Sequence, residues 1–188
     1  MRRAGAAPIA CLIALAAGSA AAQLDAIPLG HFSSARPGGE LPAGWRKYAF
    51  GSIERQTEFS LVELDGRTVL RADASASMAG LIFELRAEPK RTPWLQWSWR
   101  AENAVSRGDI RTKAGDDYAA RLYVLFDYDA SRLPLGERAR IALARLVYGQ
   151  DLPLAALCYV FDSRQPVGFS AWSPYTNRMR VIVAAGGK

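Results

Sequence analysis

Hydrophobic and polar residues alternate along much of this chain, the pattern of extended strands that bury one face. Residues 118–126 show it clearly, with leucine, valine and phenylalanine on one side and arginine and tyrosine on the other. Because successive side chains of a strand point to opposite faces, each such segment is predicted to be a half-buried strand. The same alternation covers residues 81–85, 94–100, 155–161 and 178–184.

Two further segments carry local signals of their own. Asp65-Gly66 separates the strand-like residues 57–64 and 67–73 and predicts a hairpin with a type I′ turn. Residues 135–148 instead follow the helical period of about 100° per residue. Gly149 is well placed to end that helix. Arginines flank the apolar arc, so the helix either leans on a sheet or grips an anionic surface.

These elements together predict a mainly β protein. Many short strands, turn-rich joints and one helical insert near residues 135–148 favour an antiparallel two-sheet β-sandwich of the jelly-roll kind. A parallel sheet covered on both faces would show continuous apolar runs instead. Residues 23–188 have a normal length for a single domain, which buries about 70% of its unfolded surface.

The first 22 residues have the pattern of a secretory signal peptide. Arg2 and Arg3 precede the apolar run 9–17, and Ala20–Ala22 supplies the small residues that favour cleavage before Gln23. The run is shorter than the ~20 residues that cross a bilayer, and no later segment is apolar for long enough. We therefore expect an exported protein, periplasmic or extracellular, without a transmembrane segment.

Charge and cysteine content narrow the partners and the chemistry. Cleavage would remove Arg2 and Arg3, leaving 22 of 24 basic residues against 18 acidic ones, a net charge of +4. This mild excess, without long basic runs, argues against nucleic acid as a partner. Cys158 is the only cysteine after the leader, so no internal disulfide is expected. Its apolar surroundings predict a small buried hydrophobe rather than a reactive thiol.

Several blocks occur together in a recognisable order. They are Gly44-Trp45, SMAGL at 77–81, WSWR at 97–100, GDDYAARLYVLF at 115–126, CYVF at 158–161 and PYT at 174–176. The set resembles the exported bacterial proteins of the domain-of-unknown-function 3047 family. This resemblance implies secretion and a β-rich domain, and it implies no activity.

The carboxyl end departs from that family pattern. Family members usually continue past the strand at 178–184 with a helical stretch and a final strand, whereas this sequence ends at Lys188. If that strand normally pairs inside the sandwich, we expect either a truncated chain with an open sheet edge or another element that covers the edge.

The sequence gives little support for a catalytic site. His31 is the only histidine, which argues against a multi-histidine zinc site, and no G-x-S-x-G sequence is present. Glycoside hydrolysis needs two facing acids, and Glu63 with Asp65 has that spacing on a strand. However, the hairpin turn already uses Asp65. We therefore expect no catalytic residues.

Asp116-Asp117 allows three interpretations. The two acids shape a turn after Gly115, or they pair with an arginine such as Arg100 or Arg121, or they bind calcium with other aspartates. The turn and the ion pair are favoured together. No cofactor is expected apart from a structural calcium ion under the third interpretation.

The aromatic residues give the main hint of a ligand. Trp97 and Trp99 share a face with Leu95 and are assigned to the core, while Trp94 and Trp172 are better candidates for an exposed sugar platform. The hypothesis is an exported, non-catalytic module that binds a glycan or another envelope component. The alternatives are a carboxylate-dependent enzyme acting on a polysaccharide and a structural envelope protein. The predicted ligand-binding residues are Arg100, Asp116, Asp117, Arg121, Tyr123 and Trp172.

Overall fold

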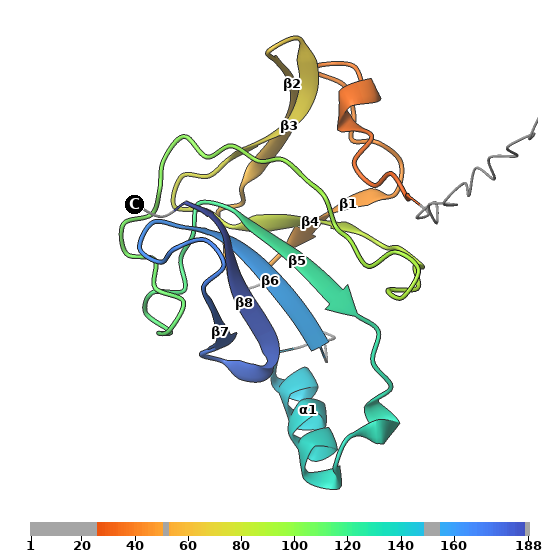
Figure 1. Ribbon diagram of the computed structural model, residues 1–188, viewed down its shortest axis with the longest axis vertical. Coiled ribbons are helices and arrows are strands. Elements are labelled where there is room, and N and C mark those ends of the chain that lie inside the picture. The colour runs from red at the N-terminus through yellow and green to blue at the C-terminus, as the bar shows by residue number, and fades with distance from the viewer. Residues whose placement is uncertain (1–25, 51–52, 149–154, 187–188) are drawn as a thin grey trace, which may run out of the picture. The chain divides into compact units, whose positions relative to one another are not determined.

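A computed structural model describes residues 26–50, 53–148 and 155–186 (Figure 1). The predicted signal peptide and Gly149 lie outside these ranges. The described chain is mainly β, as expected, with eight strands in three small sheets. It divides into two compact units after Gln96, and the single domain over 23–188 stays a prediction.

Two small sheets form the first unit. Strand β1 (Trp45–Ala49) pairs antiparallel with β4 (Ala79–Phe83). The Trp45 ring lies 5.3 Å from Phe32, in the short 3-10 helix η1 (Phe32–Ser34), and 5.3 Å from Phe83. Its indole N–H donates to the Leu29 carbonyl at 3.2 Å. Aromatic packing therefore fixes the start of β1.

The second sheet of this unit is the hairpin predicted from the Asp-Gly pair. Strands β2 (Glu58–Leu64) and β3 (Arg67–Asp73) pair antiparallel over their full lengths. Asp65 and Gly66 have φ of 52° and 74°, the positive values that a type I′ turn requires at both central positions. The hairpin is confirmed.

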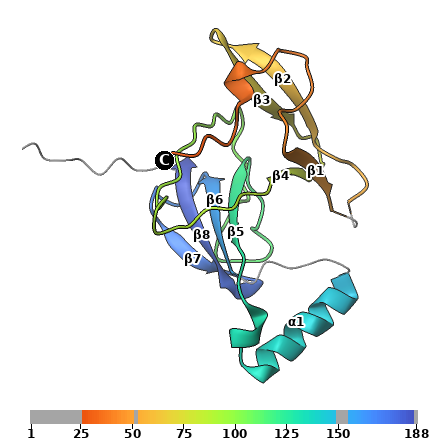
Figure 2. The same ribbon diagram turned by 90° about the vertical axis from the view of Figure 1, so that its right-hand side faces the viewer.

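The second unit contains a four-stranded sheet in the order β5-β6-β8-β7 (Figures 1 and 2). Its strands are β5 (Arg121–Phe126), β6 (Ala155–Asp162), β7 (Ser170–Ser173) and β8 (Thr176–Gly186).

The pairing in this sheet corrects one expectation. The prediction of antiparallel strands is wrong at one pair, because β6 and β8 run parallel. Strand β8, which includes the predicted strand 178–184, is hydrogen-bonded to β6 on one side and β7 on the other. The edge strands of this sheet are therefore β5 and β7, and the expectation of a truncated chain or a covered edge stays a prediction.

One face of this sheet carries the core of the second unit. Cys158, Val160, Val181 and Val183 are buried there and pack with Ile110 and Tyr118 from the preceding loop. Cys158 is buried, as predicted from its apolar neighbours.

The tryptophan segment differs from its predicted structure. Residues 93–100 form no strand, so the prediction for 94–100 is wrong in its backbone. The side chains of Trp97 and Trp99 nevertheless pack on β6 and are half-buried, on the face opposite Cys158 and Val160: Trp97 lies 5.0 Å from the Tyr159 ring, and Trp99 lies 6.2 Å from Phe161. Alternation of hydrophobic and polar residues predicts which side chains are covered. A strand also needs a neighbouring strand with which its backbone can pair.

Helix α1 (Leu135–Tyr148) has the predicted bounds and follows the short 3-10 helix η2 (Ala130–Arg132). It stands clear of the sheet in both views (Figures 1 and 2). Leu135, at the start of its apolar arc, is exposed, while Glu137 forms an ion pair with Arg178 of β8. No helix within the described ranges is both long and apolar enough to cross a membrane.

Candidate ligand-binding surface

The strand register decides which predicted residues share a face of the four-stranded sheet. Tyr123 pairs with Cys158, and Cys158 pairs with Val181, so these side chains lie on the core face. Trp172 pairs with Arg180, the neighbour of Val181 along β8, and both therefore lie on the opposite face. The predicted ligand residues are thus split between two faces.

Three of the predicted residues come together on the core face. One Arg121 N–H donates to Asp116 Oδ1 at 2.9 Å, another donates to the Asp116 carbonyl at 2.6 Å, and a third contact reaches the Tyr123 hydroxyl at 3.4 Å. The guanidinium also lies 4.9 Å from the centre of the Tyr118 ring. Among the interpretations of Asp116, the ion pair with Arg121 is the one observed.

 The cluster of Asp116, Arg121 and Tyr123 therefore comes from one short segment of the chain, because Asp116 and Arg121 are only five positions apart.

Burial shapes the chemistry of the neighbouring groups. Burial, followed by the nearby Cys158 sulfur, raises the pKa of Tyr123 to about 12. Burial also raises the pKa of the Cys158 thiol to about 11, against the lowering effect of its hydrogen bond with Tyr123. Both groups stay protonated and uncharged at neutral pH. This part of the core face therefore has the properties of a structural cluster.

The other predicted residues lie outside this cluster. Asp117 approaches Arg107 at 4.0 Å, with both side chains exposed. Arg100 is exposed and forms no hydrogen bond or ion pair with any described residue. Within the described ranges, no three histidine, cysteine or acidic side chains lie close enough together to hold a metal ion.

Trp172 is held in place at the end of β7 by a cation. Its side chain is 56% exposed, and the Arg180 guanidinium lies 5.2 Å from its ring centre. Arg180 is itself fixed, because its Nη2 and Nε atoms donate to the Ser170 hydroxyl at 2.8 and 3.2 Å. Ser170 and Arg180 thus brace an exposed indole from one side.

Tyr175 provides a second exposed ring, in the turn that joins β7 to β8. It is 59% exposed, and its hydroxyl donates to the Lys113 carbonyl at 3.3 Å. The Lys113 ammonium lies 5.3 Å from the ring centre. The Tyr175 N–H donates to the Ser173 hydroxyl at 3.2 Å, which fixes the turn. We call these two ring–cation pairs at the β7–β8 hairpin, Trp172 with Arg180 and Tyr175 with Lys113, the hairpin surface.

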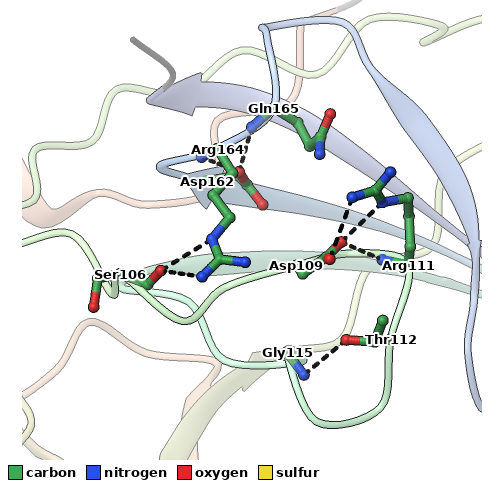
Figure 3. A network of polar contacts seen from close by, with 8 residues as sticks. All are labelled: Ser106, Asp109, Arg111, Thr112, Gly115, Asp162, Arg164 and Gln165. Atoms are coloured by element: carbon green, nitrogen blue, oxygen red, sulfur yellow. Dashed lines mark hydrogen bonds and ion pairs between the residues drawn. The ribbon is translucent and has the colours of Figure 1, made fainter.

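The loop that carries Lys113 is tied down by polar contacts (Figure 3). Asp109 accepts hydrogen bonds from the backbone and the side chain of Arg111, each at 3.1 Å. The Gly115 N–H donates to the Thr112 hydroxyl at 3.1 Å, and the Asp109 N–H donates to the Gly115 carbonyl at 2.7 Å. These bonds close the loop on both sides of Lys113 and so fix its position beside Tyr175.

The end of β6 and the residues that follow it anchor the first residues of the same loop. The buried Asp162 carboxylate accepts from the N–H groups of Arg164 and Gln165 at 2.6 and 2.7 Å. The Arg164 guanidinium then donates to the Ser106 carbonyl at 2.8 and 3.0 Å (Figure 3). A rigid strand end therefore supports the loop.

Sequence reasoning identified Trp172 but missed the residues that brace it. Arg180 lies across a strand pair from Trp172, and Lys113 lies in a loop 62 positions before Tyr175. The aromatic pair around Ser173-Pro174 was a local signal for this hairpin. The cations could be assigned to it only once the register was known.

Comparison with known proteins supports the family resemblance. A family model described as a protein of unknown function (DUF3047) matches residues 43–188. No curated protein and no solved structure matches the chain.

Proposed function

The chain belongs to the DUF3047 family of proteins of unknown function, and we propose that it is a non-catalytic binding module for a glycan or another envelope component. The proposed ligand site is the hairpin surface. The observation that carries this proposal is the exposed Trp172 ring, held from one side by Arg180 and Ser170.

An indole ring that is held in one orientation can stack on the ring of a sugar. The carbon-bound hydrogens of a pyranose form an apolar face that packs on an aromatic ring, while nearby polar groups bind the hydroxyls. Because Arg180 and Ser170 already fix the indole, little side-chain entropy is lost when a ligand stacks on it. Tyr175 adds a second ring three positions away on the same hairpin.

The compartment and the sandwich arrangement belong to the same proposal. The pattern of the first 22 residues supports export, to the periplasm or beyond, where glycans of the envelope are available. The alternating burial along β6, with Cys158 and Val160 buried on the core face, supports the sandwich arrangement, in which a second layer covers such a face.

The test compares two exposed tryptophans. We expect Trp172→Ala to weaken retention on a panel of bacterial and plant polysaccharides by roughly 30-fold, since truncating a central aromatic contact costs about 2 kcal/mol. Trp94→Ala tests the other platform candidate: Trp94 is 81% exposed and lies in the first unit, and because the proposed site is the hairpin surface, retention should stay at the wild-type level. Affinity electrophoresis measures both variants, with circular dichroism to verify folding.

Two results would contradict the proposal. Equal retention of the wild type and Trp172→Ala would remove the hairpin surface as the site. Release of reducing sugar ends during the same incubation, undiminished in Trp172→Ala, would favour a carboxylate-dependent enzyme instead.

A further inference from the structure

The two cations of the hairpin surface lie beside aromatic rings rather than carboxylates. Other arginines in the described residues form ion pairs, as in Arg46–Glu84, Arg111–Asp109 and Arg121–Asp116. Among the described residues, neither Arg180 nor Lys113 has an acidic partner; each instead lies beside an exposed aromatic ring. Their positive charges are therefore not neutralised within the described part of the chain.

Arg180 also keeps hydrogen-bonding capacity. Its Nε and Nη2 atoms bind Ser170, while Nη1 forms no hydrogen bond with any described residue. A guanidinium presents its donors in a fixed plane, which matches the geometry of a carboxylate. The Ser170 contacts hold that plane still, so the remaining donors are oriented before any ligand arrives.

From this geometry we infer that the hairpin surface selects an acidic polysaccharide, one whose sugar units carry carboxylates. The inference rests on the proposed function and specifies its ligand class. A sugar ring stacks on Trp172, and carboxylates along the polymer bind Arg180 and Lys113. The rest of the chain is compatible with this ligand, because its formal net charge is positive.

The experiment uses two polymers that differ only in charge. Polygalacturonate and its fully methyl-esterified form share one backbone, and esterification removes the carboxylate charge. We expect the wild type to bind polygalacturonate at least tenfold more tightly at low salt, with the preference shrinking at 0.5 M NaCl, where screening shortens the range of charge interactions to below about 8 Å.

Single cation variants then locate the preference. Lys113→Gln and Arg180→Gln should each reduce the ratio of the two affinities several-fold. Lys47→Gln removes an exposed cation of β1 in the first unit and should leave the ratio unchanged. The ratio is the readout because Arg180→Gln also loosens Trp172, which weakens binding of both polymers together.

Each outcome has one meaning. Equal affinity for the two polymers, with binding that still depends on Trp172, would overturn the acidic ligand and leave the proposed function standing. A preference that Lys47→Gln reduces as much as Lys113→Gln would also overturn it, because net charge would then be the cause. Retention of either polymer that ignores Trp172→Ala would overturn the proposed function itself.

Discussion

The Arg121–Asp116 pair allows a direct test of whether predicted ligand residues are structural. Arg121 donates two hydrogen bonds to Asp116 and one to Tyr123, and it also faces the Tyr118 ring. The Arg121 and Asp116 side chains are only 21% and 25% exposed. Replacing Arg121 with Met keeps the length of the side chain and removes the charge together with these contacts.

The expected cost follows from this partial burial. Breaking a fully buried ion pair costs about 3–5 kcal/mol, whereas an exposed pair contributes about 0–1 kcal/mol. With roughly a quarter or less of each side chain exposed, Arg121→Met should lower the free energy of unfolding by about 2–3 kcal/mol. Asp116→Asn keeps the backbone carbonyl contact and should cost about 1–2 kcal/mol.

Urea denaturation followed by circular dichroism measures both variants and the double variant. A loss of 2–3 kcal/mol moves the midpoint by about 1 M urea. The double-mutant cycle should give a coupling free energy of at least about 1 kcal/mol, because the two side chains bind each other directly. Polysaccharide retention by the folded variants should match the wild type.

The reasoning fails if Arg121→Met leaves the urea midpoint unchanged and abolishes retention. Arg121 would then act on a ligand, and the core face would replace the hairpin surface as the binding site.

Two further predictions concern the backbone and pH. Gly186 has φ of +97°, and an added Cβ would overlap the Asp162 carbonyl, whereas Gly168 has φ of +88° with open space around it. In the same urea assay, Gly168→Ala should therefore lower the free energy of unfolding by about 1 kcal/mol from its conformation alone, and Gly186→Ala should lower it clearly more. Equal losses for the two variants would show that β8 relaxes freely at its end. Alkaline pH should destabilise the protein through Cys158, whose thiol pKa rises from 9.0 to about 11 on folding. As the pH rises, the unfolded chain loses this proton first, so the free energy of unfolding falls by about 2–3 kcal/mol between about pH 9 and 11. Cys158→Ala should make this fall shallower. An unchanged pH profile in that variant would contradict the burial argument.

The elements that depend on nearby residues were predicted well from the sequence. The turn at Asp65-Gly66 needs only two residues that accept positive φ, and α1 needs only the spacing of its apolar residues. The segment 94–100 failed because its alternation reflects packing of Trp97 and Trp99 on β6, with no neighbouring strand to complete a ladder. The parallel β6–β8 pair depends on strand order, which no local pattern records.

The candidate site was predictable to the same extent. Asp116 and Arg121 are close in sequence, so their ion pair was among the interpretations that the sequence allowed. Trp172 stood out by its type and its place before a turn. Its partner Arg180 could not be assigned, because a slip of one residue in register would place this arginine on the core face.

The order of strands in the four-stranded sheet has a consequence for biosynthesis. Strand β8 leaves the ribosome after β5, β6 and β7, yet it fills the position between β6 and β7. Until it emerges, β7 has no partner in this sheet, and the braced Trp172 lacks Arg180. Pairing of β6 with β8 therefore has to wait until both strands of the β7–β8 hairpin are available, whereas Trp172 and Arg180, eight positions apart, come together as soon as that hairpin forms.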